Sequence, residues 1–357
     1  MNSEIWAERS VFVTGHTGFK GGWLSLWLHH LRAQVHGYAL NPLIESNLFE
    51  VARVAELLTT DTRANVTDLE ALQSSLKRAQ PEVVFHLAAQ PLVRESYRNP
   101  LSTLTTNVMG ATHLMEAIRN VESVRAVVII TTDKVYENRE WVYPYRETDT
   151  LGGHDPYSAS KAAAEIVVAS YRASFFGKGT DKPLVHIATA RAGNVIGGGD
   201  WSNDRLVPDC LRAFEKAESV HLRYPHAVRP WQHVLEPLSG YLLLAERLLG
   251  TDASHYASSW NFGPDASGDA TVGEIAQGLA NLWGKSARVE LAHEAEHPHE
   301  AGLLRLDITR ARKELGWRPR WVLNQTLQAT VEWHQAWIGG EDMSTKCLEQ
   351  IRNYEDA

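Results

Sequence analysis

Short runs of apolar residues alternate with longer stretches of helical periodicity through the first half of the chain. The runs predict buried strands at residues 10–14 (SVFVT), 34–39, 82–87 and 125–130. Between them, apolar side chains recur every three or four positions and predict helices at residues 22–31, 68–79 and 107–120. This alternation predicts a parallel sheet with helices packed on both of its faces.

After residue 190 the alternation gives way to loops rich in glycine and tryptophan, such as GNVIGGGDWSNDR. Helical periodicity returns in four stretches, at residues 207–217, 237–249, 272–283 and 327–337. The sequence shows no repeat, low-complexity tract or obvious linker. We therefore expect a smaller second lobe that is interleaved with the sheet, rather than a separate domain on a flexible connection.

Composition narrows the classes of function. The chain has 357 residues, of which 22% are charged and 44% hydrophobic, as in globular proteins that bury a sizeable core. The formal net charge is -8 and no basic block stands out, which argues against nucleic-acid and membrane partners. Cys210 and Cys347 have no metal-ligand spacing and form no disulfide framework. With no signal peptide and no apolar run of about 18 residues, we expect a cytoplasmic protein.

A glycine triplet follows the first predicted strand. Gly15, Gly18 and Gly21, in TGHTGFKG, lie between that strand and the first predicted helix. Glycine permits a tight turn and a close approach of the backbone to a pyrophosphate, and the N–H groups that begin the helix favour that anion. Because the strand and the helix that such a triplet requires are both predicted, we expect a Rossmann-type dinucleotide-binding domain.

The end of the second predicted strand, YALN, bears on which dinucleotide binds. An acidic residue about 20 positions beyond the glycine triplet normally receives the adenosine ribose hydroxyls. Here the strand ends in Leu40 and Asn41, and no arginine stands beside them in the sequence to hold a 2′-phosphate. We expect NAD, held less firmly at its ribose than is usual, with Asn41 as a candidate contact.

Tyr157 and Lys161, in DPYSASKAAAE, are four residues apart and would share one face of a helix. A tyrosine hydroxyl with a pKa of about 10 is a poor base at neutral pH. A neighbouring ammonium group and a positively charged nicotinamide ring would favour the phenolate and lower that pKa. The spacing arises often by chance, but together with the upstream glycine loop it predicts a catalytic pair.

Two opposite charges, Asp133 and Lys134 in TTDKVY, directly follow the apolar run that ends at residue 130. Sheets of this kind bind their ligands at the carboxyl ends of the strands. We therefore expect both charges beside the nicotinamide.

Five motifs together resemble the extended short-chain dehydrogenase/reductase family, specifically its enzymes that act on nucleotide sugars. The motifs are TGHTGFKG, HLAAQ, TTDK, YSASK and RAGNVIGGGD. GHTGFKGGW, TTDK, RAGNVIGGGDW and RPWQHVLEPLSGYL are most similar to the branch that dehydrates CDP-glucose, rather than to the branches for dTDP- or GDP-sugars. The resemblance runs from about residue 5 to about residue 340 and implies a role in deoxysugar biosynthesis of the lipopolysaccharide type.

The resemblance implies a dehydration in which NAD is reduced and reoxidised within one turnover. Tyr157 would take the proton of the sugar 4-hydroxyl while hydride leaves C4. Lys161 would hold the nicotinamide ribose and lower the tyrosine pKa, and Thr132 would hydrogen-bond the 4-oxygen. Water would then leave across C5 and C6, and hydride would return to C6 to give a 4-keto-6-deoxy sugar.

For the elimination, relatives carry an Asp–Glu pair where this chain has Asp133 and Lys134. Asp133 would protonate the departing C6 hydroxyl if a buried site keeps it protonated. Lys134 is either the base for the C5 proton or a charged group that stabilises the enolate. As a base it must be neutral, and moving its pKa from about 10.4 to about 7 requires roughly 4–5 kcal/mol, which burial can supply. We favour the base.

The resemblance also implies cofactor and substrate contacts. The cofactor contacts are Gly15, Thr17, Gly18, Phe19, Lys20, Gly21, Asn65, Val66, Leu87, Ala88, Ala89, Asn107 and Thr131, together with Tyr157 and Lys161. Asn65 and Val66 stand where relatives carry an acidic residue and an aliphatic one beside the adenine, and the amide oxygen of Asn65 could still accept a bond from the adenine amine. The substrate contacts are Asn194, Arg205, Arg229 and His299. Subunits of this family usually pair through a four-helix bundle, so we expect a homodimer or a higher homo-oligomer.

The expected α/β fold is thus a Rossmann-type doubly wound parallel sheet with a smaller, interleaved C-terminal substrate lobe. Residues 1–190 and about 230–262 would form the NAD domain, about 191–229 and 263–340 the substrate lobe, and 341–357 a C-terminal tail. Two other functions remain open, a nucleotide-sugar 4-epimerase and a silent dinucleotide-binding protein. The histidines of HEAEHPHEAG, residues 293–302, could suggest a metal, but we expect a loop beside the nucleotide and no metal site.

Overall fold

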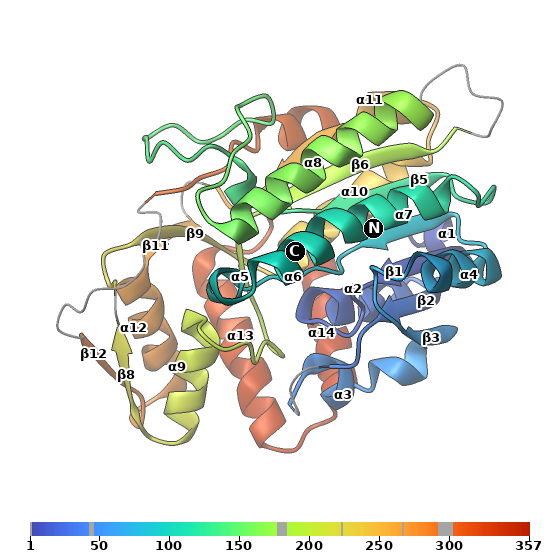
Figure 1. Cartoon of the computed structure of the whole chain (residues 1–357). Helices are drawn as coiled ribbons and strands as arrows, with labels where there is room; N and C mark the ends of the chain where they lie inside the picture. The colour runs from blue at the N-terminus through green and yellow to red at the C-terminus, as the bar shows by residue number, and fades with distance from the viewer. Residues whose placement is uncertain (1, 43–45, 177–183, 223, 266–267, 292–302) are drawn as a thin grey trace.

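A seven-stranded parallel sheet forms the centre of the computed structural model, which describes residues 2–42, 46–176, 184–222, 224–265, 268–291 and 303–357 (Figure 1). Its strand order is β10-β6-β5-β4-β1-β2-β3. The strands are β1 (Ser10–Thr14), β2 (Gln34–Ala39), β3 (Thr60–Arg63), β4 (Val83–His86), β5 (Ala126–Ile130), β6 (His186–Ala192) and β10 (Ser259–Phe262). The chain moves outward from β1 in one direction and from β4 in the other, so the two strands meet at the switch point where such sheets bind ligands.

Helices cover both faces of this sheet, as expected for a doubly wound fold. One face carries α4 (Leu69–Ala79), α7 (Gly110–Ile118) and α8 (Pro156–Phe175), and the other carries α2 (Phe19–His30) and α10 (Leu235–Leu248). The side chains of α2 are buried almost all round, because the helix lies between the sheet and further helices. The predicted fold class is therefore confirmed.

A smaller lobe follows β6 and lies to one side of the sheet in Figure 1. It contains α9 (Leu206–Glu215), α12 (Val272–Trp283), the sheet β11-β9-β7 and the pair β12-β8. Its strands are β7 (Asn194–Ile196), β8 (Ser219–Leu222), β9 (Val228–His233), β11 (Asp269–Thr271) and β12 (Arg288–Leu291). A separate hydrophobic core, including Leu211, Phe214 and Ile275, holds these elements together.

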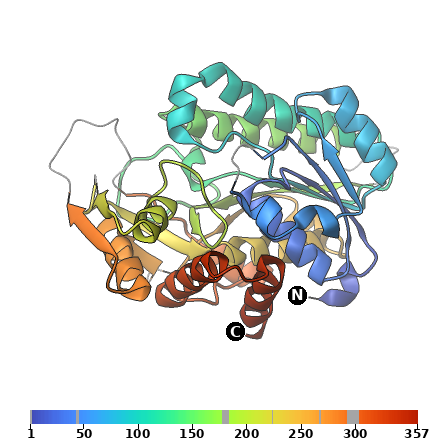
Figure 2. The same cartoon turned by 90° about the horizontal axis from the view of Figure 1, so that it is seen from below.

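The two C-terminal helices, α13 (Leu323–Ile338) and α14 (Met343–Asp356), pack side by side in Figure 2. The segment expected to be a tail thus contains α14, which also packs against α2. Buried Glu236 of α10 fixes this arrangement, because its carboxylate accepts bonds from Tyr354 Oη at 2.6 Å and Trp321 N at 2.7 Å. No helix in the described ranges is both long and apolar enough to cross a membrane.

The apolar pattern located most of the longer elements to within a few residues. The bounds of β2 and α12 match the predictions, whereas α2 begins three residues earlier than expected. Strand β3 was not predicted, because its residues are polar and largely exposed. The remaining short helices are α1 (Ser3–Trp6), α3 (Leu48–Val51), η1 (Val54–Leu57), α5 (Val93–Arg98), α6 (Pro100–Leu104), the π-helical η2 (Thr105–Met109), η3 (Asp133–Val135), α11 (Ala253–Tyr256) and the π-helical η5 (Ala311–Leu315).

Candidate active site

The glycine loop between β1 and α2 has a shape that other residues could not adopt. Gly15 has φ of +79°, and a Cβ there would lie 2.7 Å from the backbone nitrogen of Ala88. A Cβ on Gly21 would lie 2.1 Å from the carbonyl oxygen of Gly15. Because the N-cap of α2 is Gly18, no side chain caps the N–H groups of the first helical turn. The loop therefore fits a pyrophosphate at a helix N-terminus.

The loop that follows β4 runs beside this turn and is fixed by side chains. Thr14 Oγ1 accepts a bond from Ala88 N at 3.2 Å. Asn107 in η2 accepts from Gln90 N at 2.8 Å, and its amide nitrogen donates to Gln90 O at 3.1 Å and Ser160 Oγ at 2.8 Å. Both donors of Asn107 are thus used inside the protein. Asn107 was expected to touch the cofactor, and the structure shows it as a link between the loop and α8.

Helix α8 starts beside the end of β5, which brings the predicted catalytic residues together. Asp155 caps the helix by accepting from Ser158 N at 2.9 Å, and Pro156 follows at the first helical position. Tyr157 follows directly, Lys161 lies about one turn further, and both side chains are buried. Lys161 Nζ donates to the carbonyl oxygen of Ile130, the last residue of β5, at 3.1 Å.

The residues after β5 complete a buried polar cluster with Tyr157. Thr132 Oγ1 donates to Asp133 Oδ1 at 2.9 Å, and Thr132 also acts on the pKa of Tyr157, whose side chain lies beside it. Thr132, Asp133 and Tyr157 are each exposed by less than a tenth. The side chain of Lys134 is only partly buried, and its backbone N–H points to Thr132 Oγ1 at 3.4 Å. The carboxyl end of β5 therefore holds an acid, a phenol and a hydroxyl in contact with one another.

Burial shifts the pKa of Asp133, Tyr157 and Lys161. It raises the pKa of Asp133, although the charge of Lys134 and the bond from Thr132 oppose the shift. It also raises the pKa of Tyr157 to about 12, against the effect of Thr132. This is the opposite direction from the expectation for Tyr157, because burial dominates in the protein alone and Lys161 points to Ile130. Burial lowers the pKa of Lys161 to about 8, and Glu165 opposes that change.

The sequence reasoning missed Glu165, which lies four residues after Lys161 on the same helix. Its Oε1 accepts from Thr131 Oγ1 at 2.6 Å, and its Oε2 accepts from Thr189 Oγ1 at 2.7 Å. Arg191 pairs with it at 2.9 Å, and both side chains are 2% exposed. Burial alone would raise the pKa of Glu165, but Arg191 and these bonds hold the pKa below its ordinary value. Thr131, which was expected beside the cofactor, donates a hydrogen bond from its hydroxyl group to this carboxylate.

Three basic residues from separate elements approach the same cluster. Burial and the charges of Arg205 and Lys161 lower the pKa of Lys20 to about 7, and Asp133 acts in the opposite direction. Arg205 Nη1 pairs with Asp200 Oδ2 at 2.9 Å. Arg229 lowers the pKa of Asp133, so it also lies close to the carboxylate. The structure thus brings Lys20, Arg205 and Arg229 near the cluster, and their roles there stay predictions.

Tyr241 of α10 is a further polar group at this place. Lys20 Nζ lies 5.9 Å from the centroid of its ring, and the charge of Tyr157 acts on its hydroxyl. That hydroxyl is buried and has no hydrogen-bond partner among the described residues. A buried polar atom normally has a partner. The orphaned hydroxyl therefore fits a cluster that takes up a polar ligand.

At the far end of the glycine loop, the structure corrects one sequence-based statement. No arginine follows the second strand in the sequence, but Arg63 of β3 reaches that strand's end and donates to Leu40 O at 3.4 Å. Thr17 Oγ1 donates to the same carbonyl oxygen at 3.0 Å. Nearby, Asn65 Oδ1 accepts from Thr67 N at 3.0 Å, and Val66 is buried. Arg63 was not expected at this place because strand β3, in which it lies, was not predicted.

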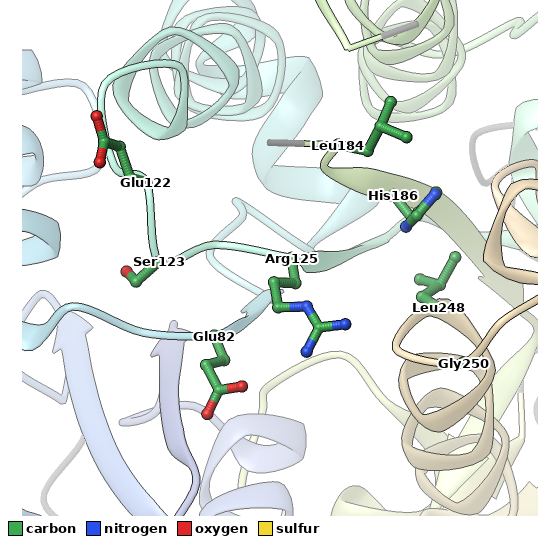
Figure 3. Close-up of a pocket in the computed structure, with 8 residues that line it drawn as sticks. All are labelled: Glu82, Glu122, Ser123, Arg125, Leu184, His186, Leu248 and Gly250. Carbon is green, nitrogen blue, oxygen red and sulfur yellow. The ribbon is translucent and has the colours of Figure 1, made fainter. Parts of the chain in front are cut away.

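His299 and the histidine-rich stretch 293–302 lie outside the described residues. Within the described ranges, no group of three or more His, Cys, Asp and Glu residues could hold a metal ion. The hollow in Figure 3 is lined by Glu82, Glu122, Ser123, Arg125, Leu184, His186, Leu248 and Gly250, at the amino ends of β4, β5 and β6. It contains none of the predicted site residues, which gather at the opposite edge of the sheet.

Comparison with known proteins identifies the family. A family model described as GDP-mannose 4,6 dehydratase matches residues 12–330 of this chain. The chain belongs to the GDP-mannose 4,6 dehydratase family. The CDP-glucose 4,6-dehydratase of Salmonella typhimurium is 49% identical over 358 residues, which cover 100% of this chain and 99% of that protein. The UDP-glucose 4-epimerase of Mycolicibacterium smegmatis is 28% identical, over 90% of this chain and 97% of that protein.

A solved structure of another sugar-nucleotide dehydratase has the same fold as this chain. The dTDP-glucose 4,6-dehydratase of Streptomyces venezuelae, determined with NAD bound, superposes with a TM-score of 0.78 at 21% identity. The match covers 94% of this chain and 99% of that one. These comparisons confirm the resemblance that the five motifs indicated. The names of these relatives specify different nucleotides, and the fold of the solved structure is the fold of this chain.

Proposed function

We propose that this chain converts CDP-D-glucose to CDP-4-keto-6-deoxy-D-glucose, with NAD as an internally recycled cofactor, in deoxysugar biosynthesis. The observation that carries the proposal is the buried contact of Thr132, Asp133 and Tyr157 at the carboxyl end of β5, beside a dinucleotide-shaped glycine loop. The 49% identity to a CDP-glucose 4,6-dehydratase over the whole chain supports cytidine as the base. Bound NAD would accept hydride from C4 and return it to C6.

The glycine loop, Thr17, Phe19, Leu87, Ala88 and Ala89 would hold the cofactor. Gly15 and Gly21 allow the close approach, and the first turn of α2 supplies N–H donors to the pyrophosphate. Lys161 would hold the nicotinamide ribose by exchanging its bond to Ile130 O. Because the pKa of Lys161 is about 8, its side chain is mostly protonated at neutral pH and can donate.

Tyr157 would remove the proton of the sugar 4-hydroxyl, and Thr132 would hydrogen-bond the 4-oxygen. The effect of Thr132 on the pKa of Tyr157 supports a shared role for these two side chains at one oxygen of the substrate. Burial raises the pKa of Tyr157 to about 12 in the protein alone, so the phenolate needs positive charge nearby. Lys161, Arg205 and the cationic ring of the cofactor are the groups that can supply it.

Asp133 would protonate the departing C6 hydroxyl. Its raised pKa supports this role, since an aspartate with an ordinary pKa would be ionised at neutral pH and could not act as an acid. Lys134 would take the C5 proton and return a proton to C5 after hydride reaches C6. The electrostatic effect of Lys134 on Asp133 supports neighbouring roles for these two groups.

Arg205, Arg229 and Asn194 would bind the pyrophosphate of the substrate. Asn194 lies in β7, Arg229 lies in β9 and Arg205 is the N-cap of α9, so the smaller lobe would supply the substrate site. Arginine suits this task because its planar fork matches phosphate oxygens. The proposed division into an NAD domain and a substrate lobe follows from this placement.

The test is incubation of the protein with NAD and CDP-glucose, followed by strong base, in which a 4-keto sugar absorbs in the near ultraviolet. Formation of the chromophore, with loss of one water by mass, is expected. A 4-epimer without chromophore would establish an epimerase instead, and no conversion would support a silent binding protein. Parallel reactions with dTDP-, UDP- and GDP-glucose test the base, and a faster reaction with any of them would overturn cytidine.

We further propose a homodimer or a higher homo-oligomer formed by a second copy of the chain, in the cytoplasm. Neighbouring helices α6, η2 and α8 expose large apolar side chains, namely Leu101, Leu104, Met109 and Ile166. Such a face on a globular protein fits an interface between subunits. Light scattering after size-exclusion chromatography should give at least twice the 39.9 kDa chain mass, and the double variant L101D/I166D should shift it to the monomer. A monomeric native protein would refute the proposal.

A further inference from the structure

We propose that Asp200 is a positioning residue, which holds Arg205 in place for the pyrophosphate of the nucleotide-sugar substrate. The inference rests on the proposed function, in which Arg205 binds that pyrophosphate. It adds a residue that acts through Arg205 and lies in the same loop, between β7 and α9.

Asp200 uses both of its carboxylate oxygens inside the protein. Its Oδ2 pairs with Arg205 Nη1 at 2.9 Å, and its Oδ1 accepts from Ser202 N at 3.0 Å. The side chain of Asp200 is 5% exposed, whereas that of Arg205 is 35% exposed. Water therefore screens this ion pair less than it screens pairs on the open surface. A buried carboxylate thus holds one side of a guanidinium that a ligand can still reach.

The backbone beside Asp200 is anchored by two helices. The ring of Trp201 packs edge to face against Trp333 and Trp337 of α13, with ring centroids 5.6 and 5.0 Å away. The carbonyl oxygen of Trp201 accepts from Arg212 Nη1 of α9 at 2.9 Å. Asp200 is therefore held in place by the fold of the loop and does not depend on Arg205 for its position.

Arg205 keeps donors for phosphate oxygens. A guanidinium has five N–H donors, and among the residues that the structure describes only Asp200 accepts from this one. Burial and the charge of Arg205 lower the pKa of Lys20, so Arg205 lies near the buried cluster. Because an arginine side chain has many rotamers, fixing it before the ligand arrives avoids part of the entropy loss on binding. The pair with Asp200 thus prepares a planar fork that suits phosphate.

Calorimetric titration of the NAD-loaded protein with CDP tests the proposal without relying on turnover, because CDP carries the two phosphates of the nucleotide sugar. We expect Asp200→Asn to weaken CDP binding about tenfold, the scale of one charge-assisted hydrogen bond. Asp342→Asn is the matched control, since Asp342 also pairs with an arginine, Arg53, and accepts from a backbone N–H, that of Thr345, but caps α14. The control should leave CDP binding unchanged.

A double-mutant cycle shows whether Asp200 acts through Arg205. Arg205→Gln should weaken CDP binding by about tenfold or more, and adding Asp200→Asn should change it further by less than about twofold. Losses that add in the double variant would refute the inference, as would wild-type affinity of Asp200→Asn beside a weakened Arg205→Gln. If the wild-type protein does not bind CDP, or Arg205→Gln binds it equally well, the proposed substrate site fails and the inference fails with it.

Turnover distinguishes positioning from a general loss of structure. The pyrophosphate is remote from C4, C5 and C6 of the sugar, so a weaker hold on it removes binding that substrate and transition state share. Asp200→Asn should therefore raise KM for CDP-glucose about tenfold and lower kcat by less than about threefold. Asp200→Ser, which also keeps an oxygen for Ser202 N, should give the same result. A lower kcat at wild-type KM in these variants would overturn the inference.

Discussion

Replacing Glu165 by glutamine should both destabilise the fold and shift the pH dependence of catalysis. The carboxylate accepts bonds from Thr131, Thr189 and Arg191, all buried with it. Removing its charge leaves Arg191 buried without a counter-ion, which costs about 3–5 kcal/mol when a buried pair is broken. Glu165 also opposes the fall in the pKa of Lys161, so that pKa should drop below its present value of about 8.

The catalytic consequence follows from the charge on Lys161. With a lower pKa, Lys161 loses its proton at a lower pH, and the positive charge that favours the Tyr157 phenolate disappears earlier as the pH rises. The alkaline limb of the kcat profile with CDP-glucose should therefore move to lower pH. Chemical denaturation measures the stability change, and the alkaline absorbance of the 4-keto product measures the rate.

Two matched variants distinguish an effect of Glu165 on the pKa of Lys161 from a general loss of stability. Glu236→Gln also alters a buried carboxylate, but one that bonds Tyr354 and the backbone of Trp321 away from the cluster. It should lower stability and leave the pH profile unchanged. Glu165→Gln combined with Arg191→Met removes both charges, so it should restore part of the stability and keep the shifted profile. An unshifted profile in both Glu165 variants would refute the link between Glu165 and Lys161.

Three further changes test the proposed roles. Lys134→Gln should abolish exchange of the C5 hydrogen with solvent deuterium while partial C4 oxidation persists, and retained exchange would exclude Lys134 as the base. Asp133→Asn should slow elimination by about 10²–10⁴-fold, the usual contribution of a general acid. The same variant should stabilise the fold at neutral pH. Because the pKa of Asp133 is higher in the folded than in the unfolded protein, the free energy of unfolding falls as the pH rises above the pKa of the unfolded state. A wild-type free energy of unfolding that stays unchanged between pH 4 and 7 would contradict that shift. Gly21→Ala should weaken NAD binding, since its Cβ would lie 2.1 Å from Gly15 O, and NAD titration with wild-type affinity would contradict the loop geometry.

The local pattern was enough to predict the sheet and the gathering of Thr132, Asp133, Tyr157 and Lys161 at one edge of it. Apolar runs mark buried parallel strands, and the residues at their carboxyl ends must then meet at one edge. The placement of Thr132 and Asp133 after β5 therefore followed from the run that ends at Ile130. The four-residue spacing of Tyr157 and Lys161 fixed their common helical face in the same way. Glu165 continues that spacing by one more turn, so the sequence contained a signal that could have found it.

What the sequence could not supply depends on contacts between distant elements. Strand β3 has the polar sequence TDTR and lies at the edge of the sheet, so it has no apolar pattern to detect. Because β3 was not predicted, the position of Arg63 beside Leu40 could not be predicted, and no charged side chain was expected at the end of the second strand. The approach of Tyr241 and Lys20 to the cluster has the same origin, because α10 and α2 are more than 200 residues apart in the chain.

The shifted pKa values of the buried cluster also could not be predicted from residue identity alone. Asp133, Lys161 and Lys20 are each displaced toward the neutral form, and in each case burial is the largest cause. Only the folded sheet edge, enclosed by α8 and α2, creates that burial. Proton transfer is most efficient when acids and bases have pKa values near the working pH. The same burial that costs stability at these positions raises the pKa of Asp133 and lowers the pKa of Lys161 and Lys20, in each case toward the range in which proton transfer is efficient.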